Sequence, residues 1–274
     1  MNKKKLKQLL IGDFSFKRLI LSFVFIYLSI LLYGVFWGDR AIFLPQPSSY
    51  QDSPEIMKLN SGGKHKISAI YLPNNKAYYT ILFSHGNAED LGDIRPVLKE
   101  LHQGGFSVFA YDYQGYGTSQ GTPSEQNTYQ DIDAAYDYLT TQLKIPRDRV
   151  LAYGRSVGGG PTVDLVSRKP LAGLILESTF ISAFRVITKI PLFPFDKFTN
   201  LDKIKTIHVP VLIMHGTNDD VIPFWHGETL FAIAHPPKRF FKVEGAGHNN
   251  VMEVAGTRYF QTLSEFLKEL KFNE

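Results

Sequence analysis

The sequence has 274 residues, 44% of them hydrophobic, which is ample for one buried core and fits a single α/β domain. It contains no cysteine, so disulfides, thiolate metal sites and a cysteine nucleophile are excluded. The net charge of +4 comes from the first 18 residues, which carry six basic side chains against Asp13 alone. Because the remaining residues 19–274 have no basic surplus, we do not expect the chain to bind nucleic acid.

An uninterrupted apolar stretch follows the basic tail. Residues 19–37 read LILSFVFIYLSILLYGVFW, with no charged side chain. As a helix they extend about 28 Å, close to the hydrocarbon thickness of a bilayer. Tyr33 and Trp37 lie near the end of the stretch, where amphipathic rings favour the membrane interface. We therefore predict a transmembrane helix at 19–37 that contacts membrane lipid.

Two other interpretations of this stretch are less favoured. A cleaved signal peptide has a shorter apolar core and a small-x-small cleavage site, and neither Gly34 nor Gly38 has a small residue two places earlier. A buried helix of a soluble protein is rarely apolar on every face. Six basic residues precede the stretch, whereas only Arg40 and Lys58 follow within about twenty positions. The positive-inside rule thus predicts a single-pass membrane protein with a cytoplasmic tail at 1–18 and the large domain outside the cytoplasm.

The body of the chain alternates apolar runs with amphipathic stretches, which is the pattern of an α/β fold with a mostly parallel central sheet flanked by helices. A polar connector at 38–66 is expected to contain edge strands, and residues 67–274 are expected to form one catalytic domain. Strands are predicted at 67–72, 79–84, 106–111, 149–153, 173–177, 209–214 and 239–243. Helices are predicted at about 90–103, 123–144, 157–168, 225–234 and 251–271.

Two segments between these elements have particular sequences. Before the helix at 123–144, Thr122 is expected to act as N-cap, with Pro123 in the first turn and Glu125 completing a capping box. Residues 178–208 form a short cap-like insertion that includes FRVITKIPLFPFDKF. The insertion is either a packed crossover of helix and loop or an apolar rim that receives an acyl or other apolar substrate.

A candidate nucleophile follows the strand at 149–153. Gly154-Arg155-Ser156-Val157-Gly158 joins this strand to a helix, so that Ser156 projects from a sharp turn at the sheet edge. The small residues Gly154 and Gly158 allow the neighbouring strand and helix to approach closely. The helix N-terminus and the backbone N–H of Val157 favour negative charge developing on a substrate oxygen.

A candidate oxyanion loop follows the strand at 79–84. His85-Gly86-Asn87 lies where a second backbone donor for an oxyanion is expected, and the N–H of Asn87 is the best candidate. The side chain of His85 is interpreted as structural, hydrogen-bonded within the loop.

A candidate acid and a candidate base follow the last two strands. His215-Gly216-Thr217-Asn218-Asp219-Asp220 comes after the strand at 209–214, and its spacing does not distinguish Asp219 from Asp220. Gly245-Ala246-Gly247-His248 comes after the strand at 239–243 and brings His248 to the sheet edge. An imidazole that takes a proton from serine, and a carboxylate that orients the imidazole, complete a catalytic triad.

The four signals favour one fold. Each lies just after a strand, where open α/β sheets place their ligands, and the order Ser, Asp, His is that of the α/β-hydrolase fold. The sequence has no metal-ligand spacing, phosphate loop or dinucleotide fingerprint, so we expect neither a metal nor a cofactor.

These residues also carry a family resemblance. The stretches ILFSHGNAEDLG, YDYQGYGTSQGTPSE, YGRSVGGGPTVDLV, LILESTF, MHGTNDDVIPFWHG and VEGAGHNN resemble the α/β-hydrolases. More narrowly, the chain resembles the single-pass, membrane-anchored hydrolase-domain group that includes animal protein depalmitoylases. The resemblance implies that Asp219 is the acid, and that Asp112 and Glu177 are structural residues near the site, with Glu177 as an alternative acid. The chain departs from that group in having no N-terminal cysteine cluster.

The sequence thus predicts a membrane-anchored serine hydrolase that cleaves ester, thioester or amide bonds through an acyl-enzyme. A carboxylesterase or lipase-like enzyme acting on a small-molecule or lipid-like acyl substrate is preferred, because the anchor brings the site to lipid. A serine peptidase on the same fold is the first alternative, although 178–208 offers only Asp196 and Asp202 to bind a peptide N-terminus. A catalytically silent, membrane-tethered binding protein is the alternative of another class.

Overall fold

The computed structural model describes residues 15–191 and 193–270. The chain divides into two compact units, Met1–Ile42 and Phe43–Glu274, and each is described by itself. In the first unit, helix α2 (Phe16–Ile42) extends beyond the predicted 19–37 at both ends. The greater part of the predicted tail, residues 1–14, lies outside the described residues. Within the described ranges α2 alone is long and apolar enough to cross a bilayer, so it is a candidate transmembrane segment.

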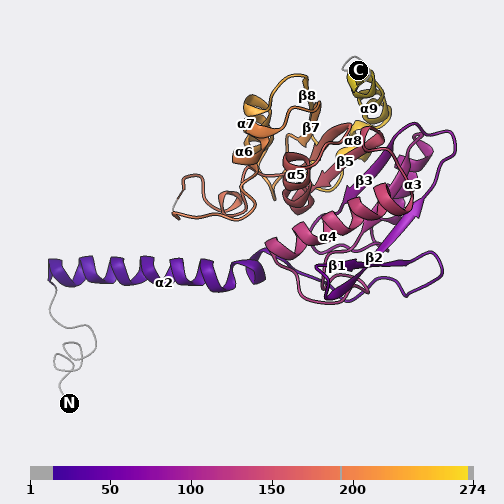
Figure 1. Ribbon diagram of the computed structural model, residues 1–274. Coiled ribbons are helices and arrows are strands. Elements are labelled where there is room, and N and C mark those ends of the chain that lie inside the picture. The colour runs from indigo at the N-terminus through magenta and orange to yellow at the C-terminus, as the bar shows by residue number, and fades with distance from the viewer. Residues whose placement is uncertain (1–14, 192, 271–274) are drawn as a thin grey trace. The chain divides into compact units, whose positions relative to one another are not determined.

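The second unit is built on one eight-stranded sheet with the order β1-β2-β4-β3-β5-β6-β7-β8 (Figure 1). β2 pairs with β1 and with β4 in antiparallel fashion, and all other neighbours are parallel. This confirms the predicted α/β-hydrolase fold with a mostly parallel sheet. The strands are β1 (Met57–Ser61), β2 (His65–Leu72), β3 (Thr80–Ser84), β4 (Ser107–Tyr111), β5 (Val150–Arg155), β6 (Gly173–Glu177), β7 (Val211–Gly216) and β8 (Lys238–Val243).

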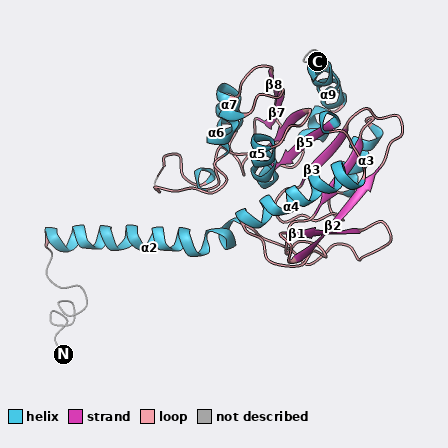
Figure 2. Cartoon of the chain, in the orientation of Figure 1, coloured by secondary structure: helices cyan, strands magenta, loops and turns pink. Residues whose placement is uncertain are grey.

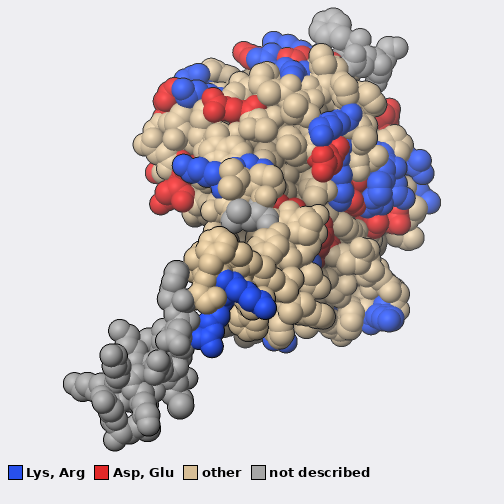
Figure 3. Space-filling model, turned by 90° about the vertical axis from the view of Figure 1, so that its left-hand side faces the viewer, with Lys and Arg blue, Asp and Glu red and all other residues tan. Residues whose placement is uncertain are grey.

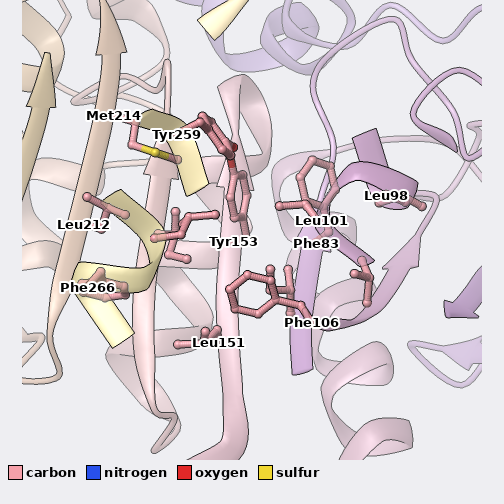
Figure 4. Close-up of a cluster of buried hydrophobic side chains, with 14 of the residues drawn as sticks. Phe83, Leu98, Leu101, Phe106, Leu151, Tyr153, Leu212, Met214, Tyr259 and Phe266 are labelled. Carbon is pink, nitrogen blue, oxygen red and sulfur yellow. The ribbon is translucent and has the colours of Figure 1, made fainter. Parts of the chain in front are cut away.

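Helices cover both faces of the sheet (Figure 2). The longer ones are α3 (Arg95–Gln103), α4 (Glu125–Asp137), α5 (Gly159–Arg168), α7 (Trp225–Ile233), α8 (Val251–Ala255) and α9 (Thr257–Leu270). Side chains of α3, α8 and α9 share one core cluster with the strands, whereas α4, α5 and α7 pack on the opposite face. Figure 4 shows this cluster, in which Leu98 and Leu101 of α3 and Phe266 of α9 face strand residues such as Phe83 and Leu151.

The start of α4 differs from the prediction. Ser124, not Thr122, is the N-cap, and its side-chain oxygen accepts a hydrogen bond from the N–H of Asn127 at 3.1 Å. Glu125 is the first helical residue and forms no capping box; its Oε1 instead accepts hydrogen bonds from the N–H of Phe198 (2.6 Å) and the hydroxyl of Tyr129 (2.7 Å). The prediction failed because Ser124 offers the same capping oxygen two residues later.

Two further segments correct the expected helices. The helix predicted at 251–271 is divided into α8 and α9 at Gly256, whose φ of +54° lies in the left-handed region. Residues 178–208 contain no crossover helix of ordinary length among those described. Their helical parts are the 3₁₀ turn Phe184–Val186, the four-residue α6 (Asn200–Lys203) and the 3₁₀ turn Ile204–Thr206.

Charged side chains are mixed on the surface. On the face shown in Figure 3, lysines and arginines lie beside acidic residues rather than in one continuous basic area. Among the charged side chains of the second unit, Arg239 forms ion pairs with Glu265 and Glu269. The catalytic unit therefore shows no large area of a single charge sign on this face.

Candidate active site

The four loops singled out in the sequence meet at one edge of the sheet. β3, β5, β7 and β8 are parallel, so their carboxyl ends point the same way. His85 follows β3 and Ser156 follows β5, while Asp219 and His248 lie in the loops after β7 and β8. Parallel topology is therefore what brings together residues that are up to 163 positions apart.

Ser156 occupies a strained turn between β5 and α5. Its φ is +55°, which non-glycine residues seldom adopt. The turn fits only because its neighbours lack side chains: a Cβ at Gly158 would overlap the carbonyl oxygens of Ser84 and His85, and one at Gly154 would crowd Gly158 and Gly159. This geometry raises the Ser156 hydroxyl above the sheet edge, as expected of a nucleophile turn.

Ser156, His248 and Asp219 form one chain of hydrogen bonds. His248 Nε2 lies 2.9 Å from Ser156 Oγ, and His248 Nδ1 lies 2.8 Å from Asp219 Oδ2. All three residues are buried. In this arrangement Nδ1–H donates to the carboxylate, leaving Nε2 to accept the serine proton.

The two adjacent aspartates have different surroundings. Asp219 Oδ1 accepts hydrogen bonds from the N–H groups of Val221 (3.0 Å) and Ile222 (2.7 Å), whereas Asp220 is exposed. Burial acts to raise the pKa of Asp219, but hydrogen bonds from His215 and His248 outweigh it and hold the pKa well below its usual range. Asp219 is thus ionised and fixed in direction before any substrate binds.

The two candidate oxyanion donors belong to the two segments next to the nucleophile: Asn87 to the loop after β3, and Val157 to the turn that follows Ser156. Val157 is in the first helical turn, where backbone N–H groups have no partner within the helix. In the loop after β3, Gly86 N–H donates to Glu89 Oε2 at 3.0 Å, and the next residue but one, Ala88, has a φ of +57°. His85 Nδ1 lies 2.8 Å from the Gly86 carbonyl oxygen, a contact within the loop, and the structural role of its side chain stays a prediction.

Asp112 and Glu177 lie behind the site rather than at the imidazole. Asp112 accepts hydrogen bonds from the N–H of Leu91 (2.9 Å) and the hydroxyl of Tyr50 (2.5 Å), and its burial raises its pKa. Glu177 Oε2 accepts hydrogen bonds from two tyrosine hydroxyls, those of Tyr153 at 2.6 Å and Tyr259 at 2.8 Å. The acid that accepts the hydrogen bond of His248 Nδ1–H is therefore Asp219, whereas Glu177 contacts the two tyrosines.

Sequence reasoning missed the contacts that hold the oxyanion loop. Arg155, the variable residue before Ser156, forms an ion pair with Glu89 of the loop. The other contact is at Asn87, whose side-chain oxygen accepts hydrogen bonds from Tyr116 and from the backbone of Leu44. An arginine beside the nucleophile and an acid three residues after Gly86 were visible signals for the first contact. Nothing in the sequence pattern indicated the second.

The described residues contain no cluster of three or more histidine or acidic side chains suited to a metal ion. A hydroxyl activated by a neutral imidazole can add to an electrophilic carbonyl carbon, and adjacent backbone N–H groups can bind the resulting oxyanion.

Comparison with solved structures supports the fold. The Pyrococcus furiosus esterase Pf2001 superposes with a TM-score of 0.68 and 18% identity, over 82% of this chain and 98% of the esterase. An α/β serine hydrolase homologue from Coxiella burnetii gives a TM-score of 0.62 and 16% identity, over 79% and 99% of the two chains. At these identities the likeness concerns the fold.

Sequence comparison is more specific. Residues 75–195 match a family model described as "Serine aminopeptidase, S33". The chain is 43% identical to alpha/beta hydrolase domain-containing protein 17B of Xenopus tropicalis and 42% identical to that of Homo sapiens, over 81% of this chain and 78% of each relative. The chain therefore belongs to the α/β-hydrolase family that these proteins represent, a serine hydrolase-like family related to the depalmitoylases.

Proposed function

We propose that this protein is a membrane-anchored serine hydrolase that cleaves a carboxylic ester, thioester or amide through Ser156, His248 and Asp219. One observation carries the proposal: the serine hydroxyl, imidazole and carboxylate lie in series at 2.9 and 2.8 Å on a turn with positive φ. A purely structural serine has no need of strained backbone and of an oriented imidazole at the same place.

The proposed reaction has two halves. Ser156 Oγ attacks the carbonyl carbon while His248 Nε2 takes its proton, and the oxyanion is held by the N–H groups of Val157 and Asn87. His248 then gives the proton to the leaving group as the carbon–leaving-group bond breaks, which leaves an acyl-serine. A water molecule gives its proton to His248 and attacks the acyl carbon, and the proton returns to Ser156 as the carboxylic acid leaves.

The preferred substrate is an acyl compound with an apolar chain, such as a carboxylester or lysophospholipid. The support is that α2 is a candidate anchor and that the insertion carries aromatic side chains: the rings of Phe184, Phe193 and Phe195 pack together with centroids 5.3 to 6.1 Å apart. A hollow of about 330 Å³ adjoins Phe193 and Phe195, and its lining combines the apolar Ile181 and Leu201 with charged side chains such as Arg185 and Asp196. These aromatic and aliphatic side chains offer apolar contact to an acyl chain.

A serine peptidase is the second candidate, favoured by the description of the matching family model. The contacts of the two acids in the insertion argue against a peptidase. Asp196 accepts hydrogen bonds from Ser182 Oγ (2.6 Å) and the N–H of Phe184 (2.8 Å), so it already has partners within the insertion. Asp202 forms an ion pair with Lys205. A catalytically silent binding protein is disfavoured by a complete set of oriented side chains.

The test is labelling by a fluorophosphonate probe in membranes containing the full chain. Wild type is expected to be labelled, Ser156→Ala unlabelled and His248→Ala labelled at least about 100-fold more slowly, because an unactivated serine is a poor nucleophile. Labelling that persists in Ser156→Ala would contradict the proposal. A panel of p-nitrophenyl esters and aminoacyl anilides then separates esterase from peptidase.

A further inference from the structure

The oxyanion loop is held by the chain segment that follows α2. Asn87, the proposed oxyanion donor, uses its side-chain oxygen for three hydrogen bonds. Oδ1 accepts from the hydroxyl of Tyr116 at 2.6 Å, from the N–H of Leu44 at 3.0 Å and from the N–H of Ala88 at 3.0 Å. The third bond reaches the N–H of Ala88, whose φ of +57° is left-handed, so the same oxygen also contacts the loop backbone next to the proposed donor.

Leu44 and Tyr116 also contact one another. The N–H of Leu44 lies 3.1 Å from the Tyr116 hydroxyl, which closes a triangle of three polar groups. Tyr116 is fully buried, and its ring lies 5.5 Å from that of His85, at the start of the oxyanion loop. Tyr116 is the buried member of this triangle, whereas Asn87 is partly exposed and Leu44 is exposed. A buried hydroxyl that loses its partners pays the cost of desolvation, which favours the arrangement that keeps Tyr116 bonded to Asn87 and Leu44.

Phe43 fixes the position of this triangle. Its side chain is 3% exposed, and its ring meets Tyr116 edge-on at 6.5 Å and Phe198 edge-on at 6.0 Å. Phe198 belongs to the insertion at 178–208. Its ring leaves no room for a Cβ at Gly160, which lies in the first turn of α5 after the nucleophile. Phe43 therefore packs between the support of the oxyanion loop and a residue that contacts the nucleophile helix.

The opposite side of the loop is held independently. Glu89 accepts the Gly86 N–H and forms the ion pair with Arg155, the residue before the nucleophile. The loop is thus fastened to the nucleophile turn at one point and to residues 43–44 at the other. Without the second contact, Asn87 would lose the hydrogen bond from Leu44, and Tyr116 would lose the packing of Phe43 against its ring.

We propose that Phe43 and the Leu44 backbone, the first residues after α2, are positioning residues for the oxyanion hole. The segment that joins the candidate anchor to the catalytic unit is then also part of the active-site support. This inference rests on the proposed serine hydrolase function, since it concerns the transition state of that reaction. It predicts that disturbing the segment lowers kcat and leaves substrate affinity unchanged, because the oxyanion forms only after substrate binds.

The experiment uses full-chain variants purified in detergent. Phe43→Ala removes the ring, Phe43→Leu keeps most of its apolar volume, and Tyr116→Phe removes only the hydroxyl that bonds Asn87. Phe106→Ala is the matched control, since Phe106 is 4% exposed, as buried as Phe43, and precedes β4 at the opposite end of the sheet (Figure 4). Hydrolysis of p-nitrophenyl butyrate gives kcat and KM, an alkyl trifluoromethyl ketone reports affinity for the tetrahedral oxyanion, and Tm reports stability.

Removing a whole oxyanion donor costs about 10²- to 10³-fold in kcat, so a misdirected donor is expected to cost about 10- to 100-fold. Phe43→Ala and Tyr116→Phe should show this loss, with an equal weakening of the ketone and an unchanged KM, and Phe43→Leu should recover part of it. Phe106→Ala should lower Tm but keep the kcat of wild type.

Either principal variant can overturn the inference. The segment would be shown only to stabilise the fold if Tyr116→Phe kept the kcat and the ketone affinity of wild type. The same conclusion would follow if Phe43→Ala lowered Tm but not kcat, as is expected of Phe106→Ala. If Phe43→Ala does not fold, Tyr116→Phe decides. Failure of the proposed function has a different signature, because fluorophosphonate labelling would then not depend on Ser156 in wild type.

Discussion

Asp219 and Asp220 differ by one position in the chain, yet only Asp219 contacts His248. Asp219→Asn should lower kcat by about 10³- to 10⁴-fold, because an amide in place of the carboxylate favours the wrong imidazole tautomer and gives an imidazolium no counter-charge. Asp220→Asn is the matched control, since the same change is made at an exposed neighbour and should leave kcat within about twofold. Steady-state kinetics on a p-nitrophenyl ester measures both. Equal losses in the two variants would contradict the assignment of the acid.

We expect Asp131, on α4, to make the stability of the protein depend on pH. Its carboxylate is buried and accepts hydrogen bonds from Ser61 Oγ (2.5 Å) and the Gln114 N–H (2.8 Å). Burial raises its pKa to about 6. Because the folded pKa exceeds the unfolded value of about 4, the protonated form is favoured by folding. The contribution of this carboxyl to the free energy of unfolding is fully present below about pH 4 and is lost as pH rises through 6. At roughly 1.4 kcal/mol per pKa unit, the free energy of unfolding falls by about 3 kcal/mol.

Asp131→Asn should remove this dependence. Between pH 4.5 and 7.5 the variant is expected to gain stability relative to wild type, as measured by Tm in a buffer series. Asp137→Asn, an exposed aspartate at the end of the same helix, serves as control and should follow wild type at every pH. Parallel curves for wild type and Asp131→Asn would show that the buried carboxyl does not titrate in this range.

At the scale of elements, the strands were predicted better than the helix ends. The seven predicted strands were all found, because buried parallel strands are short runs of apolar residues that little else in a chain resembles. Helix boundaries depend on single side chains with equivalent alternatives, as Ser124 and Thr122 show, or on a backbone angle such as that of Gly256. The loops that carry Ser156 and His248 were recognisable from glycine spacing. The contact of Leu44 with Asn87 was not, since it joins segments 43 residues apart through a backbone N–H.

The insertion at 178–208 combines a buried base with an exposed apolar tip. Phe180, Ile181 and Phe198 are buried, whereas Ile187 is 88% exposed and Ile190 63% exposed. If the tip forms a rim for acyl chains, Ile187→Ser with Ile190→Ser should lower kcat/KM for p-nitrophenyl octanoate by about tenfold, or about 1.4 kcal/mol of lost apolar contact. The acetate ester, whose chain is too short to reach the tip, should be hydrolysed as by wild type.

Tm should be unchanged by this double substitution, because neither side chain is buried. Ile233→Ser is the control for a serine at an exposed isoleucine elsewhere, on α7. If kcat/KM changed equally for the acetate and octanoate esters, the insertion would serve packing alone, and the proposal that its tip forms a rim for acyl chains would be contradicted.

The arrangement of the chain across the membrane is a proposal that rests on its sequence rather than on its family or its fold. α2 has 27 residues, about 40 Å of helix, which is enough to cross a bilayer. The basic side chains before residue 19 and their scarcity after residue 37 favour a cytoplasmic N-terminus. The proposed topology therefore places the catalytic unit outside the cytoplasm, which makes substrates of the outer leaflet or of the surroundings accessible to it.

The absence of cysteine allows a direct test of this topology, because each introduced thiol is the only one in the chain. Lys64→Cys lies in the exposed turn between β1 and β2, and Gln8→Cys lies on the other side of α2 in sequence. A membrane-impermeant maleimide applied to intact cells should label Lys64→Cys, and should label Gln8→Cys only after the membrane is permeabilised. The wild-type chain controls for background labelling. The reverse pattern would put the catalytic unit in the cytoplasm, and labelling of both positions in intact cells would show that α2 does not span the membrane.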